Sequence, residues 1–304
     1  MSYRAGFIGL IGLPNAGKST LMNCLVQEKI SIVSPKPQTT RRRMLGIVNR
    51  KDGQLVFVDA PGMVNAAKGL NGFLKKEAED VIQSSDVLLA VIALDTQDKE
   101  NVIEILDLLK KSKKPAAVIL TKTDIPAMKK RIPIVKELVE KMSPGTKVFE
   151  FSSKWGSDIT PSLKLVMDTL YELLPESPQP LYDIELFTPH TVKDLCSEII
   201  REKCFEELDK ELPYSIAIRI SGFEEAKSKK GITKIHAEII ASRESHLKMI
   251  VGKGGALIKK IGTSSRIEIE KLVGGQVFIG LKVIVRENWF ENAHHMKELG
   301  YVIS

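Results

Sequence analysis

Near its N-terminus the chain carries a glycine-spaced stretch whose residue types suit the binding of a polyphosphate. The stretch consists of Gly12, Leu13, Pro14, Asn15, Ala16, Gly17, Lys18, Ser19 and Thr20. It matches G-x-x-x-x-G-K-[ST] at every fixed position, between an apolar run and a helix-spaced apolar pattern. We expect backbone N–H groups to face the phosphates, Lys18 to reach the outer phosphates, and the Ser19 hydroxyl to ligate Mg²⁺. The alternative is a chance glycine turn ahead of a helix.

A second motif ends the apolar stretch Leu55–Val58. It has the pattern D-x-x-G and consists of Asp59, Ala60, Pro61 and Gly62. Such turns are common, but after a phosphate loop this one predicts that Asp59 holds the Mg²⁺ shell and that the Gly62 N–H senses the γ-phosphate. Met63 then stands where Ras-like enzymes carry a glutamine that orients water. Slow hydrolysis by a nucleotide-gated binder is therefore one hypothesis.

Thr121, Lys122 and Asp124 follow the apolar stretch Pro115–Leu120 and are the candidates for choosing the base. The Asp124 carboxylate can accept two hydrogen bonds from the N1–H and amino group of guanine, a pair that adenine cannot donate. The Lys122 stem is expected to lie along the base plane. The sequence therefore predicts a guanine nucleotide.

One base position departs from the usual N-K-x-D pattern, since Thr121 stands in place of the asparagine. A hydroxyl can take over part of the asparagine's tethering, so we expect lower affinity with the choice of guanine unchanged. Ser152 and Ser153 end a later apolar stretch, and their backbone is expected to meet the guanine carbonyl.

Residues 28–43 are polar and rich in proline, which predicts a long exposed loop of the kind that is often functional. Within it, Thr40 is expected to ligate Mg²⁺ together with Ser19, while Asp59 holds the shell of the ion without binding it directly. Arg41–Arg43 alone predict a solvated basic turn.

A K⁺ ion is a further hypothesis for this site. Asn15 and carbonyl groups of residues 34–39 could hold it beside the β- and γ-phosphates, where a cation would neutralise developing charge as an arginine finger does. Asn15 can equally be structural. The candidate catalytic residues are Lys18, Thr40, Gly62 and Asn15.

The elements that must position these residues alternate between strands and helices. Apolar runs predict strands over 7–11, 45–48, 55–58, 87–94, 115–120 and 149–151, and helix-spaced apolar residues predict helices over 21–26, 102–109 and 160–174. Residues 63–72 are expected to form a mobile loop. The order predicts a doubly wound α/β domain over residues 1–175, with ligand loops at the carboxyl ends of the strands.

The composition is that of a globular protein with an excess of basic residues. Its 304 residues suffice for about two domains, and the net charge of +7 favours a polyanionic partner. Cys24, Cys196 and Cys204 form no C-x-x-C pair, which is typical of free thiols in a reducing compartment. The longest apolar run falls far short of the ~20 residues of a membrane span. We therefore expect a cytosolic protein.

The second half begins after the prolines of residues 176–182, which predict a semi-rigid linker. Apolar patterns predict a helix over 191–212, strands over 214–220, 232–240 and 277–285, and two helices that meet at a G-x-x-G loop. The candidate RNA-binding residues of this loop and its flanks are Ile250, Val251, Gly252, Lys253, Gly254, Gly255, Lys259 and Lys260. This order is similar to that of a type II KH domain, whose glycines let a nucleic-acid backbone approach closely. We expect the α+β KH domain over residues 183–287 and a tail helix over 288–304.

The distribution of charge supports RNA binding by this half. Residues 227–260 carry nine Lys and Arg against two Glu, a local charge of +7, whereas residues 183–211 carry four against nine, a local charge of −5. The basic segment surrounds the G-x-x-G loop, and the acidic helix is expected to face away from it.

The motifs of the first half occur in the order and spacing of translation-factor-like GTPases, and the P-N-x-G-K-S loop with a T-T-R stretch resembles the potassium-activated members. With the KH-like half, and with Glu211–Tyr214, Ile250–Gly255 and Leu299–Tyr301, nearly the whole chain resembles the Era family of bacterial GTPases. The resemblance implies hydrolysis of GTP to GDP and phosphate with Mg²⁺. It also implies binding of single-stranded RNA near the 3′ end of 16S ribosomal RNA, a role in assembly of the 30S subunit, and peripheral contact with the inner membrane. We expect a monomer.

Two other functions remain open from the sequence. One is a GTPase that acts mainly on a protein or a membrane, with the KH domain as an accessory. The other is an RNA-binding module with a vestigial nucleotide site, which the intact Lys18, Ser19, Asp59 and Asp124 argue against.

Overall fold

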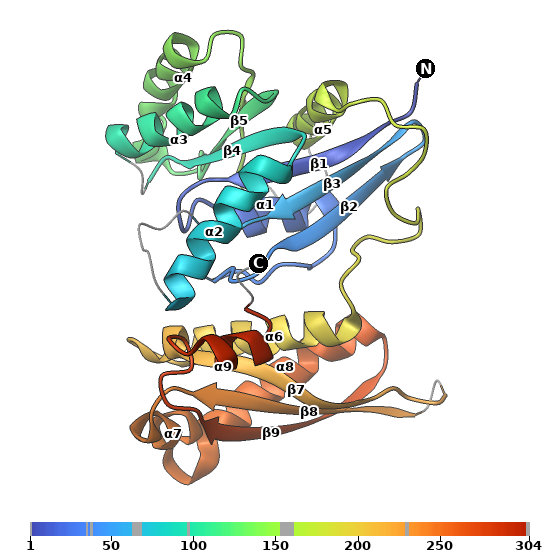
Figure 1. Ribbon diagram of the computed structural model, residues 1–304, viewed down its shortest axis with the longest axis vertical. Helices are drawn as coiled ribbons and strands as arrows, with labels where there is room; N and C mark the ends of the chain where they lie inside the picture. The colour runs from blue at the N-terminus through green and yellow to red at the C-terminus, as the bar shows by residue number, and fades with distance from the viewer. Residues whose placement is uncertain are drawn as a thin grey trace. The chain divides into compact units, whose positions relative to one another are not determined.

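The computed structural model describes residues 2–34, 36, 39–62, 69–95, 98–152, 161–228 and 231–301. The chain divides into two compact units. Unit 1 comprises Met1–Ala66 and Leu74–Pro189, and unit 2 comprises Ala67–Phe73 and His190–Ser304. Each unit is built around its own sheet (Figure 1).

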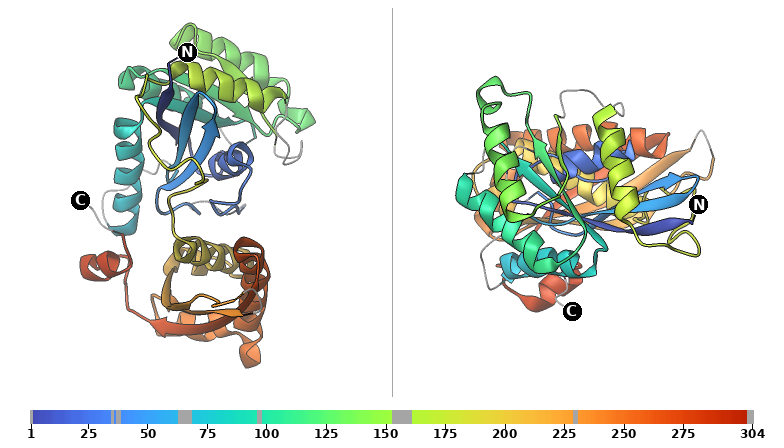
Figure 2. Two further views of the ribbon diagram at one scale, coloured as in Figure 1. Left: turned by 90° about the vertical axis from the view of Figure 1, so that its right-hand side faces the viewer. Right: turned by 90° about the horizontal axis from the view of Figure 1, so that it is seen from above.

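The described part of unit 1 contains a six-stranded sheet with the strand order β2-β3-β1-β4-β5-β6. Its strands are β1 (Arg4–Ile11), β2 (Met44–Arg50), β3 (Gly53–Asp59), β4 (Val87–Ala93), β5 (Ala116–Thr121) and β6 (Val148–Glu150). Strand β2 pairs antiparallel with β3, and the other neighbours pair in parallel. The helices are α1 (Lys18–Val26), α2 (Gly69–Ser84), α3 (Lys99–Ser112), α4 (Arg131–Met142) and α5 (Pro161–Leu173), with a short 3₁₀ turn, η1 (Pro126–Met128). The start of α2, up to Phe73, belongs to unit 2. Helices α1 and α2 lie on opposite faces of the sheet (Figure 2), so the doubly wound α/β prediction is confirmed.

The apolar patterns explain these elements. Every residue of β3 and β4 is buried, as expected of inner strands that are covered on both faces. Helix α3 buries Val102, Ile105, Leu106 and Leu109, the stripe that the sequence predicted, and the Asp98 carboxylate caps its N-terminus by accepting from the Asn101 N–H. Helices α2 and α4 were not predicted.

The carboxyl ends of the inner strands lie at one edge of the sheet and bring the motifs together. Leu10 of β1 is in register with Asp59 of β3, and Ala93 of β4 is in register with Thr121 of β5. The phosphate loop leaves the same end of β1 and leads into α1. Parallel pairing therefore places residues that are far apart in the sequence around one site.

Two loop predictions differ from the structure. Residues 28–43 are not uniformly exposed, because Ile30, Ser31 and Ile32 are buried and the Asn23 side chain bonds the backbone of Ile30 and Ser31. Residues 69–72, predicted as loop, form the first turn of α2.

The start of α2 has tertiary support within unit 2. The Leu70 N–H donates to the Phe290 carbonyl over 2.9 Å, and the Phe73 ring meets the Tyr301 ring edge-on. These contacts are distant in sequence, so local propensity did not reveal them.

Unit 2 contains a three-stranded sheet in its described residues, with the order β7-β8-β9. The strands are β7 (Ile216–Glu224), β8 (Ile232–Ala241) and β9 (Gln276–Val285); β7 and β8 are antiparallel, and β8 and β9 are parallel. The helices are α6 (Val192–Glu207), α7 (Glu244–Val251), α8 (Ala256–Val273) and α9 (Ala293–Glu298), with 3₁₀ turns η3 (Leu212–Ser215) and η4 (Lys253–Gly255). Helices α6 and α8 cover one face of the sheet (Figure 1), which confirms the KH arrangement.

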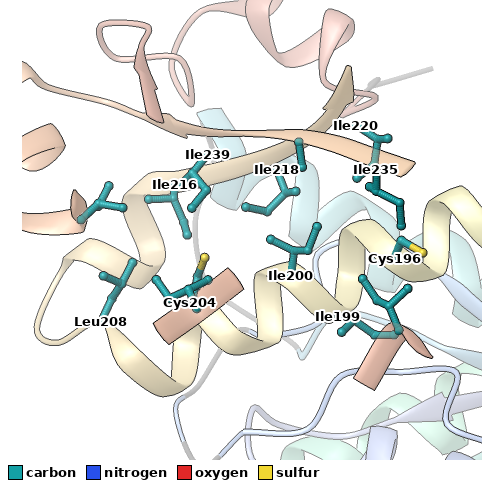
Figure 3. Packing of buried hydrophobic residues seen from close by; sticks show 14 of the residues in the cluster. Cys196, Ile199, Ile200, Cys204, Leu208, Ile216, Ile218, Ile220, Ile235 and Ile239 are labelled. Atoms are coloured by element: carbon teal, nitrogen blue, oxygen red, sulfur yellow. The ribbon is translucent and has the colours of Figure 1, made fainter. Parts of the chain in front are cut away.

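The core of unit 2 lies between α6 and the sheet. Cys196, Ile200 and Cys204 of α6 face Ile218 and Ile235 of the strands (Figure 3). Helix α6 begins at a capping box formed by Thr191 and Asp194 and ends at Glu207, earlier than predicted, because η3 takes up Leu212–Ser215.

The segment after β9 is anchored by Trp289, which is completely buried. Its indole N–H donates to the Ser215 carbonyl over 2.8 Å, and its ring stacks on Tyr301. The three cysteines are free thiols, as predicted. No helix in the described part of the chain combines the length and apolarity that a membrane crossing requires.

Candidate nucleotide and nucleic-acid sites

The phosphate loop wraps around the start of α1 and leaves a cavity of about 480 Å³. Such a volume is typical of small-molecule sites. The cavity is lined by Pro14, Asn15, Gly17, Lys18, Ser19, Thr20, Ile32, Val33, Ser34, Thr39, Thr40, Gly62, Asp95 and Lys122. Six of these residues belong to the phosphate loop, and the other eight come from later segments. Gly62 and Lys122 bring the D-x-x-G and T-K-x-D motifs into the same pocket as the loop. Met63 and Ser153 lie outside the described residues.

Lys18 is held inside the loop by backbone carbonyls. Its ammonium donates to the Gly12 oxygen over 3.0 Å and to the Leu13 oxygen over 3.1 Å. Burial lowers the pKa of Lys18 to about 8, and the nearby Asp59 carboxylate opposes this shift. A buried cation at this place is suited to polyphosphate oxygens, which would supply the opposite charge that burial calls for.

Gly62 comes so close to the phosphate loop that a side chain would not fit. A Cβ at this position would lie 2.7 Å from the Pro14 nitrogen and 2.8 Å from its Cα. The D-x-x-G turn therefore packs directly against the loop, as a backbone sensor of the outer phosphate must.

Ser19, Thr40 and Asp59 converge as predicted for a Mg²⁺ site. The Ser19 hydroxyl donates to Asp59 Oδ2 over 2.6 Å, and Thr40 Oγ1 lies 3.0 Å from Ser19 Oγ and 3.3 Å from the same carboxylate oxygen. The other oxygen, Asp59 Oδ1, is buried and has no hydrogen-bond partner among the described residues. Oxygen donors with an unpaired buried carboxylate oxygen fit a hard cation such as Mg²⁺. Burial raises the pKa of Asp59, whereas Lys18 lowers it.

The residues predicted to read the base are tied to the rest of the site. The Thr121 hydroxyl donates to the Ala16 carbonyl over 2.7 Å and so takes the tethering role proposed for it. The Ser152 hydroxyl donates to Asp124 Oδ1 over 2.5 Å, which fixes the orientation of that carboxylate. The Lys122 ammonium lies 2.8 Å from an oxygen of Asp95. Asp95 was missed, because a lone aspartate after a strand gives no signal in the sequence.

Of the three arginines after Thr40, one is buried and another is paired with two carboxylates. Arg41 is only 2% exposed. The Arg43 guanidinium makes a bidentate contact with Glu77 at 2.8 and 3.0 Å and a further bond to Asp80 at 3.0 Å. The prediction of a solvated basic turn is therefore wrong for Arg41, whereas Arg43 is partly exposed and paired. Arg43 ties the end of the Thr40 segment to helix α2.

The G-x-x-G loop of unit 2 joins α7 to α8. Gly252 has φ +73°, and a Cβ there would lie 2.7 Å from Leu257 Cβ, so the tight turn requires glycine. Gly254 and Gly255 also have positive φ values. Ile250 is completely buried and anchors α7 in the core, while Lys253 and Lys259 are exposed.

The acidic helix does not face away from the basic segment. Helix α6 packs against α8, and the Glu207 carboxylate lies 2.7 Å from the Lys260 ammonium. The sequence showed the charges but not the packing of the two helices.

A groove of about 290 Å³ runs beside α8 and β9, next to the G-x-x-G loop. It is lined by Ile258, Lys259, Gly262, Thr263, Arg266, Ile279 and Leu281. Apolar walls with basic side chains suit unstacked bases and a phosphate backbone. Except for Lys259, the sequence reasoning did not find these residues, because the groove exists only once α8 packs on β9.

Comparison with known proteins gives two family matches. Residues 7–122 match a family described as 50S ribosome-binding GTPase, and residues 211–290 match the KH domain. The chain is 37% identical to the GTPase Era of Caldicellulosiruptor saccharolyticus over 302 residues, which cover 99% of this chain and 98% of that protein. It is 35% identical to the GTPase Era of Syntrophus aciditrophicus, with 98% and 95% covered.

Two solved structures resemble the whole chain. One is an Aquifex aeolicus Era variant bound to GDP·AlF₄⁻, with a TM-score of 0.89, 29% identity, and 99% of this chain and 100% of that chain covered. The other is Era in complex with MgGDPNP and nucleotides 1506–1542 of 16S ribosomal RNA, with a TM-score of 0.90, 31% identity and the same coverage.

The fold and the order of the two domains agree with these full-length relatives. The chain therefore belongs to the GTPase Era family: it is a GTPase that uses GTP and Mg²⁺ and carries an RNA-binding KH domain.

Proposed function

We propose that this GTPase acts as a nucleotide-controlled clamp on the 3′ end of small-subunit ribosomal RNA during assembly of the 30S subunit. The observation that carries the proposal is the groove beside the G-x-x-G loop, which has apolar walls, the exposed Lys259, the partly exposed Arg266 and the size of a few bases. The Era relative with 31% identity is bound to nucleotides 1506–1542 of 16S RNA. The family described as 50S ribosome-binding GTPase matches only residues 7–122, whereas the Era structure with 16S RNA covers 99% of this chain. The small subunit is therefore the better supported target.

The nucleotide site supports hydrolysis by positioning and charge. When bound, Mg²⁺ neutralises charge between the phosphates, and Ser19, Thr40 and Asp59 are the residues that would hold it. Lys18 contributes a buried positive charge, and the Gly62 N–H is placed to follow the outer phosphate. Asp124, oriented by Ser152, reads the guanine edge.

A direct test measures binding of the labelled 3′-terminal RNA by the full chain loaded with a non-hydrolysable GTP analogue or with GDP. We expect tighter binding in one nucleotide state and loss of binding with a scrambled RNA of equal length. Equal affinity in both states would refute nucleotide control, and equal affinity for both RNAs would refute the target. Crosslinking at residues 252–255 that recovered peptides without RNA would favour a protein or membrane target instead.

The K⁺ site is part of the proposal. Asn15 lines the nucleotide pocket with φ +61°, and the carbonyls of Pro35, Pro37 and Gln38 lie outside the described residues. GTPase rates in K⁺ and Na⁺ buffers test it, with Asn15→Gly as the variant that keeps this backbone conformation. Stimulation by K⁺ that Asn15→Gly abolishes is expected; equal rates of the unaltered protein in both buffers would contradict it.

We further propose a monomer of the cytoplasm with peripheral contact to the inner membrane, and functional boundaries at residues 175, 182 and 287. Sedimentation of the purified chain, its flotation with anionic vesicles and limited proteolysis test these points separately. A stable dimer, no vesicle binding or cleavage inside residues 183–287 would overturn the respective point.

A further inference from the structure

The sheet of unit 2 has a second face, opposite α6 and α8. Along β9, Ile279, Leu281 and Val283 pack against the core on the helix side, whereas Phe278 and Lys282 are exposed on the other. Strand β8 alternates in the same way. The exposed face is not polar throughout: Phe278 is 50% exposed and Ile232, near it in the paired strand, is 49% exposed.

Two rings lie together on this face. His236 of β8 and Phe278 of β9 have centroids 5.9 Å apart at an interplanar angle of 63°. His236 is in register with Gly222 on one side and Gly280 on the other. We call His236 and Phe278, with these two glycines, the aromatic platform.

The glycines make room for the imidazole. A Cβ on Gly280 would lie 2.8 Å from His236 Nδ1, and one on Gly222 would lie 3.4 Å from His236 Cδ2. A side chain at position 280 would therefore displace the ring. The two glycines thus let the imidazole lie close to the sheet beside the exposed Phe278 ring, and a base can stack on this pair.

Cations border the platform. Lys234 is in register with Phe278, and Lys282 with Glu238. The Glu238 carboxylate is paired with Arg219, whose Nε donates to it over 2.7 Å. Lys234 lies 3.9 Å from Glu224 and stays largely exposed. The border is thus positive on balance, three cations against two carboxylates, which suits phosphates next to stacked bases better than a purely apolar partner.

We propose that the aromatic platform stacks bases of single-stranded RNA that extends beyond the G-x-x-G groove. The inference rests on the proposed RNA clamp and adds a second contact to it. Strand β9 connects the two places, since Ile279 and Leu281 line the groove while Phe278 lies on the opposite face. Because β9 is an edge strand, an RNA strand that leaves the groove can cross this edge and reach the platform. Base stacking on exposed sheet aromatics is a known mode of RNA recognition.

The test compares two RNAs on the full chain loaded with a GTP analogue. One has about four nucleotides, enough for the groove alone, and the other extends it to roughly three times that length. We expect Phe278→Ala to lower the affinity for the long RNA about tenfold, which corresponds to the loss of one base stack. Its affinity for the short RNA should be unchanged. Phe278→Trp should restore the affinity, and its fluorescence should be quenched by the long RNA only.

Further variants separate stacking from other contacts. Phe278→Leu keeps an apolar side chain without a π face, so it should bind the long RNA as weakly as Phe278→Ala. Ile134→Ala is the matched control, because Ile134 is an exposed apolar residue in unit 1. Circular dichroism checks that each variant is folded.

The outcomes that overturn the platform differ from those that overturn the clamp. Unchanged long-RNA affinity in Phe278→Ala, or full affinity in Phe278→Leu, refutes stacking. Loss of vesicle binding in Phe278→Ala with RNA binding unchanged assigns the face to lipid instead. If the unaltered protein fails to bind the short RNA, or Gly252→Asp leaves it bound, the clamp itself is refuted.

Discussion

Removing the Thr121 hydroxyl should lower the affinity for guanine nucleotides without changing the preference for guanine over adenine. Thr121 is 3% exposed, and its hydroxyl donates to the carbonyl of the fully buried Ala16 over 2.7 Å. Thr121→Val keeps the shape but leaves that carbonyl without this donor, at a cost of ~1–3 kcal/mol. If about 1–2 kcal/mol of this cost falls on the free energy of nucleotide binding, the Kd should rise roughly 5- to 30-fold.

The assay is a titration with fluorescent GDP and GTP analogues, with ATP as competitor and urea unfolding in parallel. Thr121→Ser retains the donor and should bind nearly as the unaltered protein does, and Thr121→Asn should bind at least as tightly. Thr188→Val is the matched control, because it removes a buried hydroxyl bond of the same kind, to the Leu45 carbonyl, outside the nucleotide pocket.

The control shows whether nucleotide affinity or general stability has changed. Thr188→Val should lower the free energy of unfolding and leave both nucleotide affinities in place. If Thr121→Val bound GDP as well as the unaltered protein, or admitted ATP, the tether would not have the role assigned to it.

Three further predictions concern charge and backbone. Because burial lowers the pKa of Lys18 to about 8 and phosphates bind its protonated form, GDP affinity should fall as pH rises through 8, by up to about tenfold per pH unit. Calorimetric titration between pH 7 and 9 checks this, and a similar slope in Lys18→Arg would contradict it. Arg43→Gln breaks the bonds to Glu77 and Asp80 and should lower the unfolding free energy by ~1 kcal/mol; an unchanged urea midpoint would argue against the contact. Gly252→Asp adds a negative charge, like that of the phosphates, at a position where an added Cβ would lie 2.7 Å from Leu257 Cβ, so RNA affinity should drop about tenfold or more. Gly254→Ala, whose Cβ meets nothing within 4 Å, should lose far less.

The nucleotide site could be predicted because its chemistry is written in short stretches. A glycine loop, an aspartate after a strand and a T-K-x-D stretch each combine the residue types and the local geometry that the ligand requires. Parallel pairing of β1, β3, β4 and β5 then brings them to one edge of the sheet. Alternating strands and helices suffice to predict that pairing, so the fold and the ligand followed together.

What the sequence did not reveal depends on packing between distant segments. Pairing of Arg43 with Glu77 requires α2, a helix that was not predicted. The groove beside the G-x-x-G loop forms only where α8 packs on β9. Asp95 pairs with Lys122 from the end of a neighbouring strand. In each case the side chain looks ordinary in its own stretch, and its role is set by a partner far along the chain.

Two buried charged groups in the nucleotide pocket lower the stability of the folded chain. Lys18 is buried against carbonyls with its pKa lowered, and the pKa of Asp59 is raised by burial while Oδ1 has no partner in the described residues. Such groups weaken a fold unless a ligand satisfies them. Polyphosphate oxygens would satisfy the lysine, and Mg²⁺ would satisfy the carboxylate. Binding of the nucleotide and Mg²⁺ would therefore offset the free-energy cost of burying these groups. The stability of the site would then depend on the bound nucleotide, as a switch requires.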